Sequence, residues 1–135
     1  MLEEKKLINL VVPAKPEYLS LVRLVVAAAA QDIGFSEDNV ADIKVALSEA
    51  ATNVVRHAYP SNLDHREQTI NISCYQETNG FLVEVLDHGQ GMPLLPPPSE
   101  GLGFGIMGSL MDKVDVETSD NGTTVLLIKG RAAAG

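Results

Sequence analysis

The stretch from Ser48 to Ala58 most constrains the fold, because its pattern fits a helix with one polar edge and one apolar face. Side chains four residues apart stack on one side of a helix, so Glu49, Asn53 and His57 form a polar column. An apolar column beside it is expected to face the core: Ile43, Leu47, Ala50, Val54 and Ala58. Glu49 and Asn53 are therefore predicted to lie at the edge of the buried face, on the wall of a cleft.

A carboxylate one helical turn before a carboxamide suits nucleotide chemistry. The side-chain oxygen of Asn53 is a hard, neutral ligand for magnesium, and Glu49 can take a proton from an attacking hydroxyl or water. An isolated pair with this spacing is more often the solvated edge of a helix. The functional interpretation therefore depends on the motifs that follow in the chain.

The bulk composition predicts one domain over residues 1–135, large enough to bury a core without a metal or a disulfide. The net charge of −8, with three Phe, three Tyr and no Trp, argues against direct nucleic-acid binding. The single cysteine, Cys74, cannot form an internal disulfide and is expected to be a buried strand residue. No apolar run approaches the length of a membrane span and no signal-peptide pattern is present, so a cytoplasmic location without membrane contact is expected.

Apolar spacing and turn residues predict the order of the helices and strands. Strands are expected at 6–12, 68–78, 81–86, 114–119 and 123–129, and helices at 17–33, 37–58 and 103–111. Asn79-Gly80 and Asp120-Asn121-Gly122 are predicted to form the turns of two hairpins. This order predicts an α/β fold of the α+β type, a two-layer sandwich with three helices on one face of a mixed, mostly antiparallel sheet.

Asp87 ends a predicted strand and is followed at two-residue steps by Gly89 and Gly91. The simple alternative is a turn, but a turn needs only one glycine. Repeated glycines remove side chains, so a flat ligand can lie against the backbone. A carboxylate buried at such a strand end needs a hydrogen-bond donor, and the exocyclic amine of adenine would supply one.

Gly101, Gly103 and Gly105 open the last predicted helix. Exposed amides at a helix N-terminus hold phosphate oxygens well. The spacing matches neither the dinucleotide fingerprint nor the lysine-containing phosphate loop, so the motif is weak when taken alone. It gains weight because it follows the Glu49–Asn53 helix and Asp87 in the chain.

The order of these motifs resembles the GHKL superfamily, which joins histidine kinases, DNA gyrase and MutL and has the Bergerat ATP-binding fold. The small size of the chain and the residues of the predicted helix resemble the serine-protein kinase branch of this superfamily, the bacterial anti-sigma factors. The resemblance extends over residues 7–129. It is carried by SEAATNVVRHAY (48–59), which resembles the N box, by DHGQGM (87–92) and GLGFGIMGSLMD (101–112), which resemble the two glycine boxes, and by NGTTV (121–125), which resembles the last box.

The resemblance implies a role for each motif residue. Glu49 would be the catalytic base that deprotonates an acceptor serine, and Asn53 would coordinate Mg²⁺ on the phosphates of ATP. Asp87 would bind the adenine amine, and Thr123 would support that contact. The other nucleotide-binding positions would be Arg56, Gly89, Gly91, Met92, Gly101, Gly103 and Gly105. A solvated or ion-paired Arg56 is an equal alternative, and His57 is expected to be packed and hydrogen-bonded rather than catalytic.

The implied function is a serine-protein kinase that uses ATP and Mg²⁺ to phosphorylate a small anti-anti-sigma (STAS-type) protein and that sequesters a sigma factor. The resemblance also allows a homodimer. An ATP-dependent binding switch with little or no kinase activity is the main alternative, because the lid at 93–100 contains no Lys or Arg. A detached ATPase domain of a histidine kinase is a more distant one.

Overall fold

The protein is described by a computed structural model that covers residues 4–59, 68–89 and 104–130. Its strands are β1 (Lys5–Pro13), β2 (Thr69–Glu77), β3 (Gly80–Asp87), β4 (Lys113–Ser119) and β5 (Gly122–Gly130). Its helices are α1 (Leu19–Asp32), preceded by a 3-10 turn at Pro16–Tyr18, then α2 (Glu37–Asn53) and α3 (Phe104–Leu110). A π-helical turn, η2 (Val54–Ala58), continues α2.

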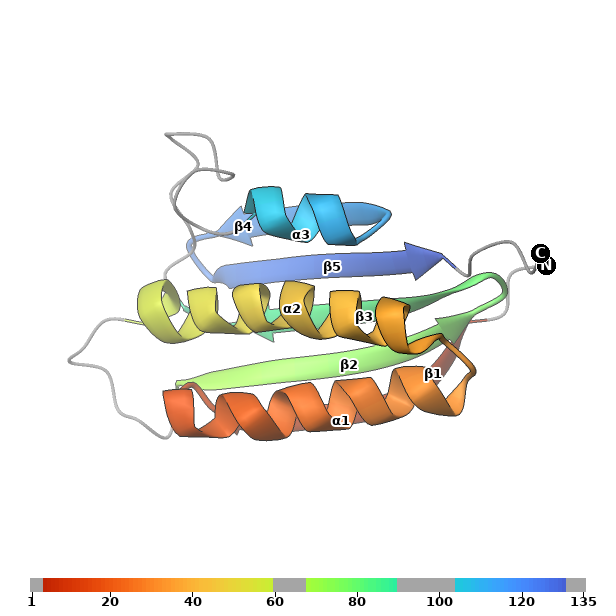
Figure 1. Cartoon of the computed structure of the whole chain (residues 1–135). Coiled ribbons are helices and arrows are strands. Elements are labelled where there is room, and N and C mark those ends of the chain that lie inside the picture. The colour runs from red at the N-terminus through yellow and green to blue at the C-terminus, as the bar shows by residue number, and fades with distance from the viewer. Residues whose placement is uncertain (1–3, 60–67, 90–103, 131–135) are drawn as a thin grey trace.

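The five strands form one sheet in the order β1-β2-β3-β5-β4, and all four pairings in the described part of the chain are antiparallel. The three helices lie on one face of this sheet, with α2 between α1 and α3 (Figure 1). The two-layer α+β sandwich predicted from the sequence is therefore confirmed. β5 is inserted between β3 and β4, so the chain order and the spatial order of the strands differ.

The core lies between the sheet and the helices, because alternate strand residues point to one face. On β3 these are Phe81, Val83 and Val85, which are at most 1% exposed. Along α2 and η2 the predicted apolar column is confirmed, since its members are all at most 2% exposed: Ile43, Leu47, Ala50, Val54 and Ala58. The burial of this stripe fixes the rotation of α2 about its axis and hence the direction of its polar edge.

The start of α2 follows local capping rules. The hydroxyl of Ser36 accepts a hydrogen bond from the backbone N–H of Asn39, at 3.2 Å, and so satisfies one of the free amides of the first turn. Glu37 and Asp38 place negative charge where the helix dipole is positive. The helix is thus defined at one end by its own sequence.

The other end of α2 differs from the prediction. The α-helix ends at Asn53, and the last turn has π-helical hydrogen bonding. A π turn takes more residues per revolution than an α turn, so each residue in it is rotated less about the axis. His57 lies in this turn and is exposed. The expectation that His57 packs into the fold is therefore wrong.

Both predicted hairpins form, each with a two-residue loop, and the glycine predicted to lie in each turn is instead the first residue of the next strand. Glu77 pairs with Gly80, so the first loop is Thr78-Asn79 and Gly80 already belongs to β3. A Cβ on Gly80 would lie 2.9 Å from the carbonyl oxygen of Lys129. Glycine is needed there for the close approach of β3 to β5, and not for the turn.

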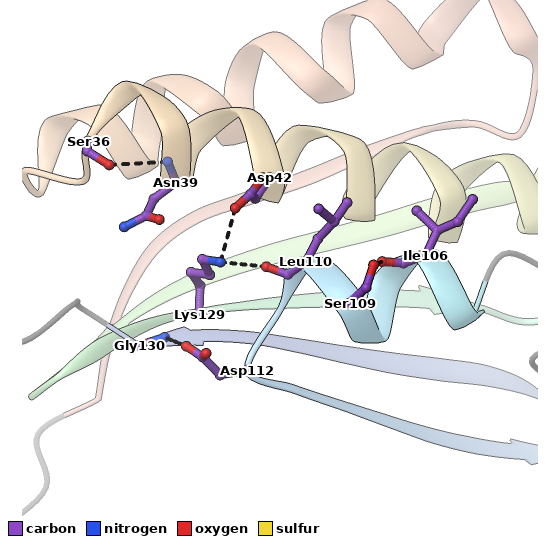
Figure 2. Close-up of polar contacts among 9 residues, drawn as sticks. All are labelled: Ser36, Asn39, Asp42, Ile106, Ser109, Leu110, Asp112, Lys129 and Gly130. Atoms are coloured by element: carbon purple, nitrogen blue, oxygen red, sulfur yellow. Dashed lines mark hydrogen bonds and ion pairs between the residues drawn. The ribbon is translucent and has the colours of Figure 1, made fainter.

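Lys129 connects the C-terminal part of β5 to two helices (Figure 2). Its ammonium group donates hydrogen bonds to the Asp42 carboxylate of α2, at 3.3 Å, and to the carbonyl of Leu110 at the end of α3. Next to it, the Asp112 carboxylate accepts the backbone N–H of Gly130. These contacts fasten the C-terminal end of α3 to both layers of the sandwich.

Candidate functional site

Four chain segments meet at one end of the molecule. The C-terminal ends of α2 and β3 lie there, together with the beginnings of α3 and β5 (Figure 1). β3 and β5 are paired at this end through Asp87 and Thr123. The described residues that are predicted to bind a nucleotide come from these segments or directly adjoin them, so the fold brings them to the same end of the sandwich.

Asp87 is a carboxylate buried at the end of β3, with 1% of its surface exposed. Its Oδ1 accepts backbone N–H groups from Gly89, at 2.9 Å, and from Thr123, at 3.3 Å. Burial raises the pKa of Asp87, while the two hydrogen bonds and the nearby His88 act in the opposite direction. Both of these amides donate to Oδ1, so within residues 4–59, 68–89 and 104–130 they leave Oδ2 as an acceptor for another donor.

Thr123 contributes to this arrangement through its backbone. The residue is 2% exposed, and its hydroxyl forms a hydrogen bond of 2.8 Å with the hydroxyl of Thr118 on β4. Gly122, just before it, has a φ of +133°, and a Cβ there would lie 2.0 Å from the carbonyl oxygen of Asp87. Gly122 therefore permits the close approach that brings the Thr123 amide within hydrogen-bonding distance of Asp87.

Gly89 links Asp87 to the end of α2. A Cβ on Gly89 would lie 2.0 Å from the carbonyl oxygen of Ala58, the last residue of the π turn. Only a residue without a side chain can therefore occupy this position. The contact fixes the segment after β3 directly against the helix that carries Glu49 and Asn53.

Asn53 and Glu49 occupy the predicted edge of α2. Asn53 is buried, with 4% of its surface exposed, and Glu49 one turn earlier is half-buried. Glu49 also lines an open groove of about 350 Å³ between α1 and α2. The other residues lining this groove are Arg23, Ala41, Lys44, Val45 and Ser48. Glu49 is thus accessible to a molecule approaching from outside, whereas Asn53 belongs to the interior.

The remaining predicted positions are distributed as follows. Arg56 is exposed on the π turn and Gly105 is exposed on α3. Gly91, Met92, Gly101 and Gly103 lie outside the described residues, as does the predicted lid at 93–100. The structure thus describes both the Asp87 side and the Asn53 side of the candidate site.

Tyr59 is a site residue that the sequence alone did not reveal. Its hydroxyl donates to the carbonyl of Thr69, at 2.7 Å, and accepts the backbone N–H of His88, at 3.0 Å. The only local indication is an aromatic residue with a polar tip just after the helix, which does not identify partners 10 and 29 residues away in the chain.

The side chains of Asp87 and Asn53 fit an adenine nucleotide with magnesium. The free acceptor side of Asp87 suits an exocyclic amine, and the Asn53 carboxamide oxygen suits a hard cation that shares its other ligands with phosphates and water. No group of three or more His, Cys, Asp or Glu side chains in the described part of the chain is placed to hold a metal ion. No helix among residues 4–59, 68–89 and 104–130 is both long and apolar enough to cross a membrane.

Known proteins resemble this chain over nearly its whole length. The family model of the histidine kinase-like ATPase domain matches residues 12–129. The serine-protein kinase RsbW of Bacillus cereus (strain B4264) is 33% identical, and the alignment covers 96% of this chain and 88% of that protein. RsbW of Bacillus mycoides matches with the same identity and coverage.

Two solved structures share the fold. A structure of the RsbU and RsbW domains of a Mycobacterium tuberculosis protein has a TM-score of 0.71 at 19% identity, covering 91% of this chain and 31% of that chain. The histidine kinase domain of a blue-light activated kinase from Erythrobacter litoralis has a TM-score of 0.61 at 20% identity, covering 88% and 61%. The chain belongs to the histidine kinase-like ATPase family, in the branch that includes the RsbW serine-protein kinases.

Proposed function

We propose that the chain is a single-domain, ATP-dependent protein serine kinase that acts on a small partner protein. The observation that carries the proposal is the direct packing of the Asp87–Gly89 segment against the end of the helix that bears Glu49 and Asn53. This packing brings Asp87, a candidate hydrogen-bond acceptor for the adenine amine, to the helix that carries a candidate metal ligand, Asn53, and a candidate base, Glu49. The serine-protein kinase names of relatives at 33% identity support the same reaction class.

Nucleotide binding is assigned to residues at both ends of this contact. Asp87 accepts the adenine amine through Oδ2, and its orientation is fixed by the two amides on Oδ1. Thr123 supports Asp87, and Gly89 keeps the backbone free of side chains. Asn53 ligates magnesium, which when bound neutralises charge on the phosphates.

Phosphoryl transfer requires mainly positioning and charge neutralisation, so the protein needs only one proton acceptor. Glu49 takes the proton of the acceptor serine hydroxyl, the serine oxygen forms a bond to the γ-phosphorus of ATP, and ADP leaves. The open groove beside Glu49 supports this role, because an acceptor side chain on another protein can reach the carboxylate there.

The proposed acceptor is a serine of a small anti-anti-sigma protein of the STAS type, and the proposed sequestered partner is a sigma factor. These partners follow from the family resemblance, which also allows a homodimer. The proposed cytoplasmic location rests on the sequence, in which no apolar run approaches a membrane span and no signal-peptide pattern is present. The net charge of −8 supports the assignment of proteins, and not nucleic acid, as binding partners.

The catalytic assignment is tested with Glu49→Gln, which keeps the shape of the side chain and removes its basicity. Transfer of labelled phosphate from ATP to the acceptor protein should fall about 100-fold or more, because a general base contributes about 10²–10⁴-fold. The affinity for ATP, measured by calorimetry, should stay within a factor of about three, since Glu49 is given no role in nucleotide binding.

Glu84→Gln is the matched control, because Glu84 on β3 alternates with the buried Val83 and Val85 and so lies on the sheet face opposite the helices. This variant should transfer phosphate at the wild-type rate. Undiminished transfer by Glu49→Gln would remove the base assignment. A wild-type protein that binds ATP but leaves the acceptor unlabelled would instead support the binding switch, which the lid without Lys or Arg also favours. Acid-labile label on the acceptor would indicate phosphohistidine chemistry.

A further inference from the structure

Tyr59 lies where β2 and β3 separate. The two strands pair from Glu77–Gly80 as far as Asn71–Leu86. Two residues further along the same register, Thr69 would face His88 (71 − 2 = 69 and 86 + 2 = 88). At that point the Tyr59 hydroxyl stands between the two backbones, donating to the carbonyl of Thr69 and accepting the N–H of His88.

The hydroxyl thus replaces a direct bond between the strands. A phenolic oxygen inserted between a carbonyl and an amide satisfies both groups while it holds the strands further apart than a ladder bond would. The same Tyr59 follows Ala58, whose carbonyl oxygen limits the position of Gly89. The segment after Asp87 is therefore held at two consecutive residues, His88 by the hydroxyl and Gly89 by the backbone of the π turn.

These two attachments, at His88 and Gly89, determine the orientation of the Asp87 carboxylate. The bond from the Gly89 amide to Oδ1 of Asp87, at 2.9 Å, closes a short ring that passes through His88. If His88 moves, the amide of Gly89 moves relative to the carboxylate. The direction of Oδ2, the oxygen left for a ligand, then changes as well.

We propose that Tyr59 is a positioning residue for adenine recognition, which acts through His88 and Gly89 on the orientation of the Asp87 carboxylate. This inference rests on the proposed nucleotide site and adds to it a specificity determinant. Tyr59 does not touch the ligand in this proposal. It sets how strongly the protein distinguishes adenine from a purine without the 6-amino group.

The test combines Tyr59→Phe with two ligands, ATP and purine riboside triphosphate, which lacks the 6-amino group. Wild-type protein should bind ATP about tenfold or more tightly than the purine analogue, since the amine then donates to a charged acceptor. Tyr59→Phe should lose most of this preference, with the ratio of the two dissociation constants falling below about three. The affinity for the analogue should change little, because it makes no bond to Oδ2.

Tyr75→Phe is the matched control, because it removes a hydroxyl from the same sheet, where the Tyr75 ring contacts Lys6. The ratio of its dissociation constants for the purine analogue and for ATP should equal that of the wild type. Thermal unfolding of each variant without nucleotide shows whether it is folded at the temperature of the binding assay.

Each result decides one question. A wild-type protein without affinity for ATP would refute the proposed function itself. A wild-type protein that prefers ATP, with an undiminished preference in Tyr59→Phe, would overturn the role of Tyr59 and leave the proposed function standing. A uniform loss of affinity for both ligands in that variant would show a structural role only.

Hydrogen exchange on the wild-type protein provides a second measurement that needs no variant. The His88 amide should exchange slowly without nucleotide, because its N–H is donated to Tyr59. Exchange at the rate of an unstructured peptide would also overturn the inference.

Discussion

Replacing Gly89 by Ala tests the contact that joins the two halves of the candidate site. The added Cβ would be placed 2.0 Å from the carbonyl oxygen, 2.6 Å from the carbonyl carbon and 2.9 Å from the Cβ of Ala58. Ordinary contact begins at 3.4 Å, so one backbone must move by 3.4 − 2.0 = 1.4 Å relative to the other. Both segments are backbone, and neither can escape by a rotamer change.

The cost of Gly89→Ala has two parts. Forcing an extra carbon into a packed site costs about 1–3 kcal/mol. The displacement also weakens the hydrogen bond from the Gly89 amide to the Asp87 carboxylate, and bonds to charged groups contribute about 1.5–3 kcal/mol. A loss near 3 kcal/mol would lower the melting temperature by about 12 °C for a domain of this size, at about 4 °C per kcal/mol. ATP affinity should fall more than tenfold, because Asp87 loses its orientation.

Differential scanning fluorimetry and calorimetry measure both effects, and Gly108→Ala is the matched control. Gly108 lies in α3, where an added Cβ would meet no atom within 4 Å, so alanine there should stabilise the helix by about 0.5–1 kcal/mol. If Gly89→Ala melted at the wild-type temperature and bound ATP normally, the close contact with Ala58 would not exist in solution.

Buried and bridging groups give three further predictions. Asp87→Asn should stabilise the nucleotide-free protein at neutral pH, because burial raises the pKa of Asp87 and its ionisation therefore costs stability as pH rises through that pKa. The difference in melting temperature between this variant and wild type should vanish at acid pH below the ordinary aspartate range, while ATP binding is lost because the carboxamide presents a donor to the amine. Lys129→Met should lower the free energy of unfolding in urea by about 1–2 kcal/mol, from the lost hydrogen bonds to α2 and α3. The exposed ion pair between Lys113 and Asp115 contributes less to stability, so Lys113→Met should change the free energy of unfolding by under about 0.5 kcal/mol. The Cys74 thiol, with no exposed surface and a pKa raised by burial to about 12, should react with a thiol reagent at pH 8 only after urea unfolds the protein, and rapid labelling of native protein would contradict this.

The sequence was sufficient to predict features with local causes. The amphipathic pattern of α2 defines which residues are buried, and the predicted start of that helix at residue 37 is also confirmed, because its cap, Ser36, is a local signal. The strand predicted at 81–86 is confirmed as β3, whose alternating residues Phe81, Val83 and Val85 are buried. Each of these features depends on neighbours within a few residues, which a single sequence displays.

Features with distant causes could not be predicted. Gly80 is needed for the close approach to Lys129 and not for the turn beside it. The sequence shows a glycine at this position but does not show which of the two reasons requires it. The π turn after Asn53 accompanies a packing contact between its last residue, Ala58, and Gly89, which lies 31 residues further along the chain. The Tyr59 bridge likewise requires partners that only the folded sheet brings together.

The insertion of β5 between β3 and β4 determines when the sheet can be completed as the chain emerges from the ribosome. While the ribosome has released only the chain as far as β4, the facing edges of β3 and β4 have no partner, and Asp87 lacks the Thr123 amide. The candidate site can therefore form only after β5 has emerged from the exit tunnel and paired with both strands. Until then a nascent chain would present the unpaired edges of β3 and β4 to chaperones or to other chains.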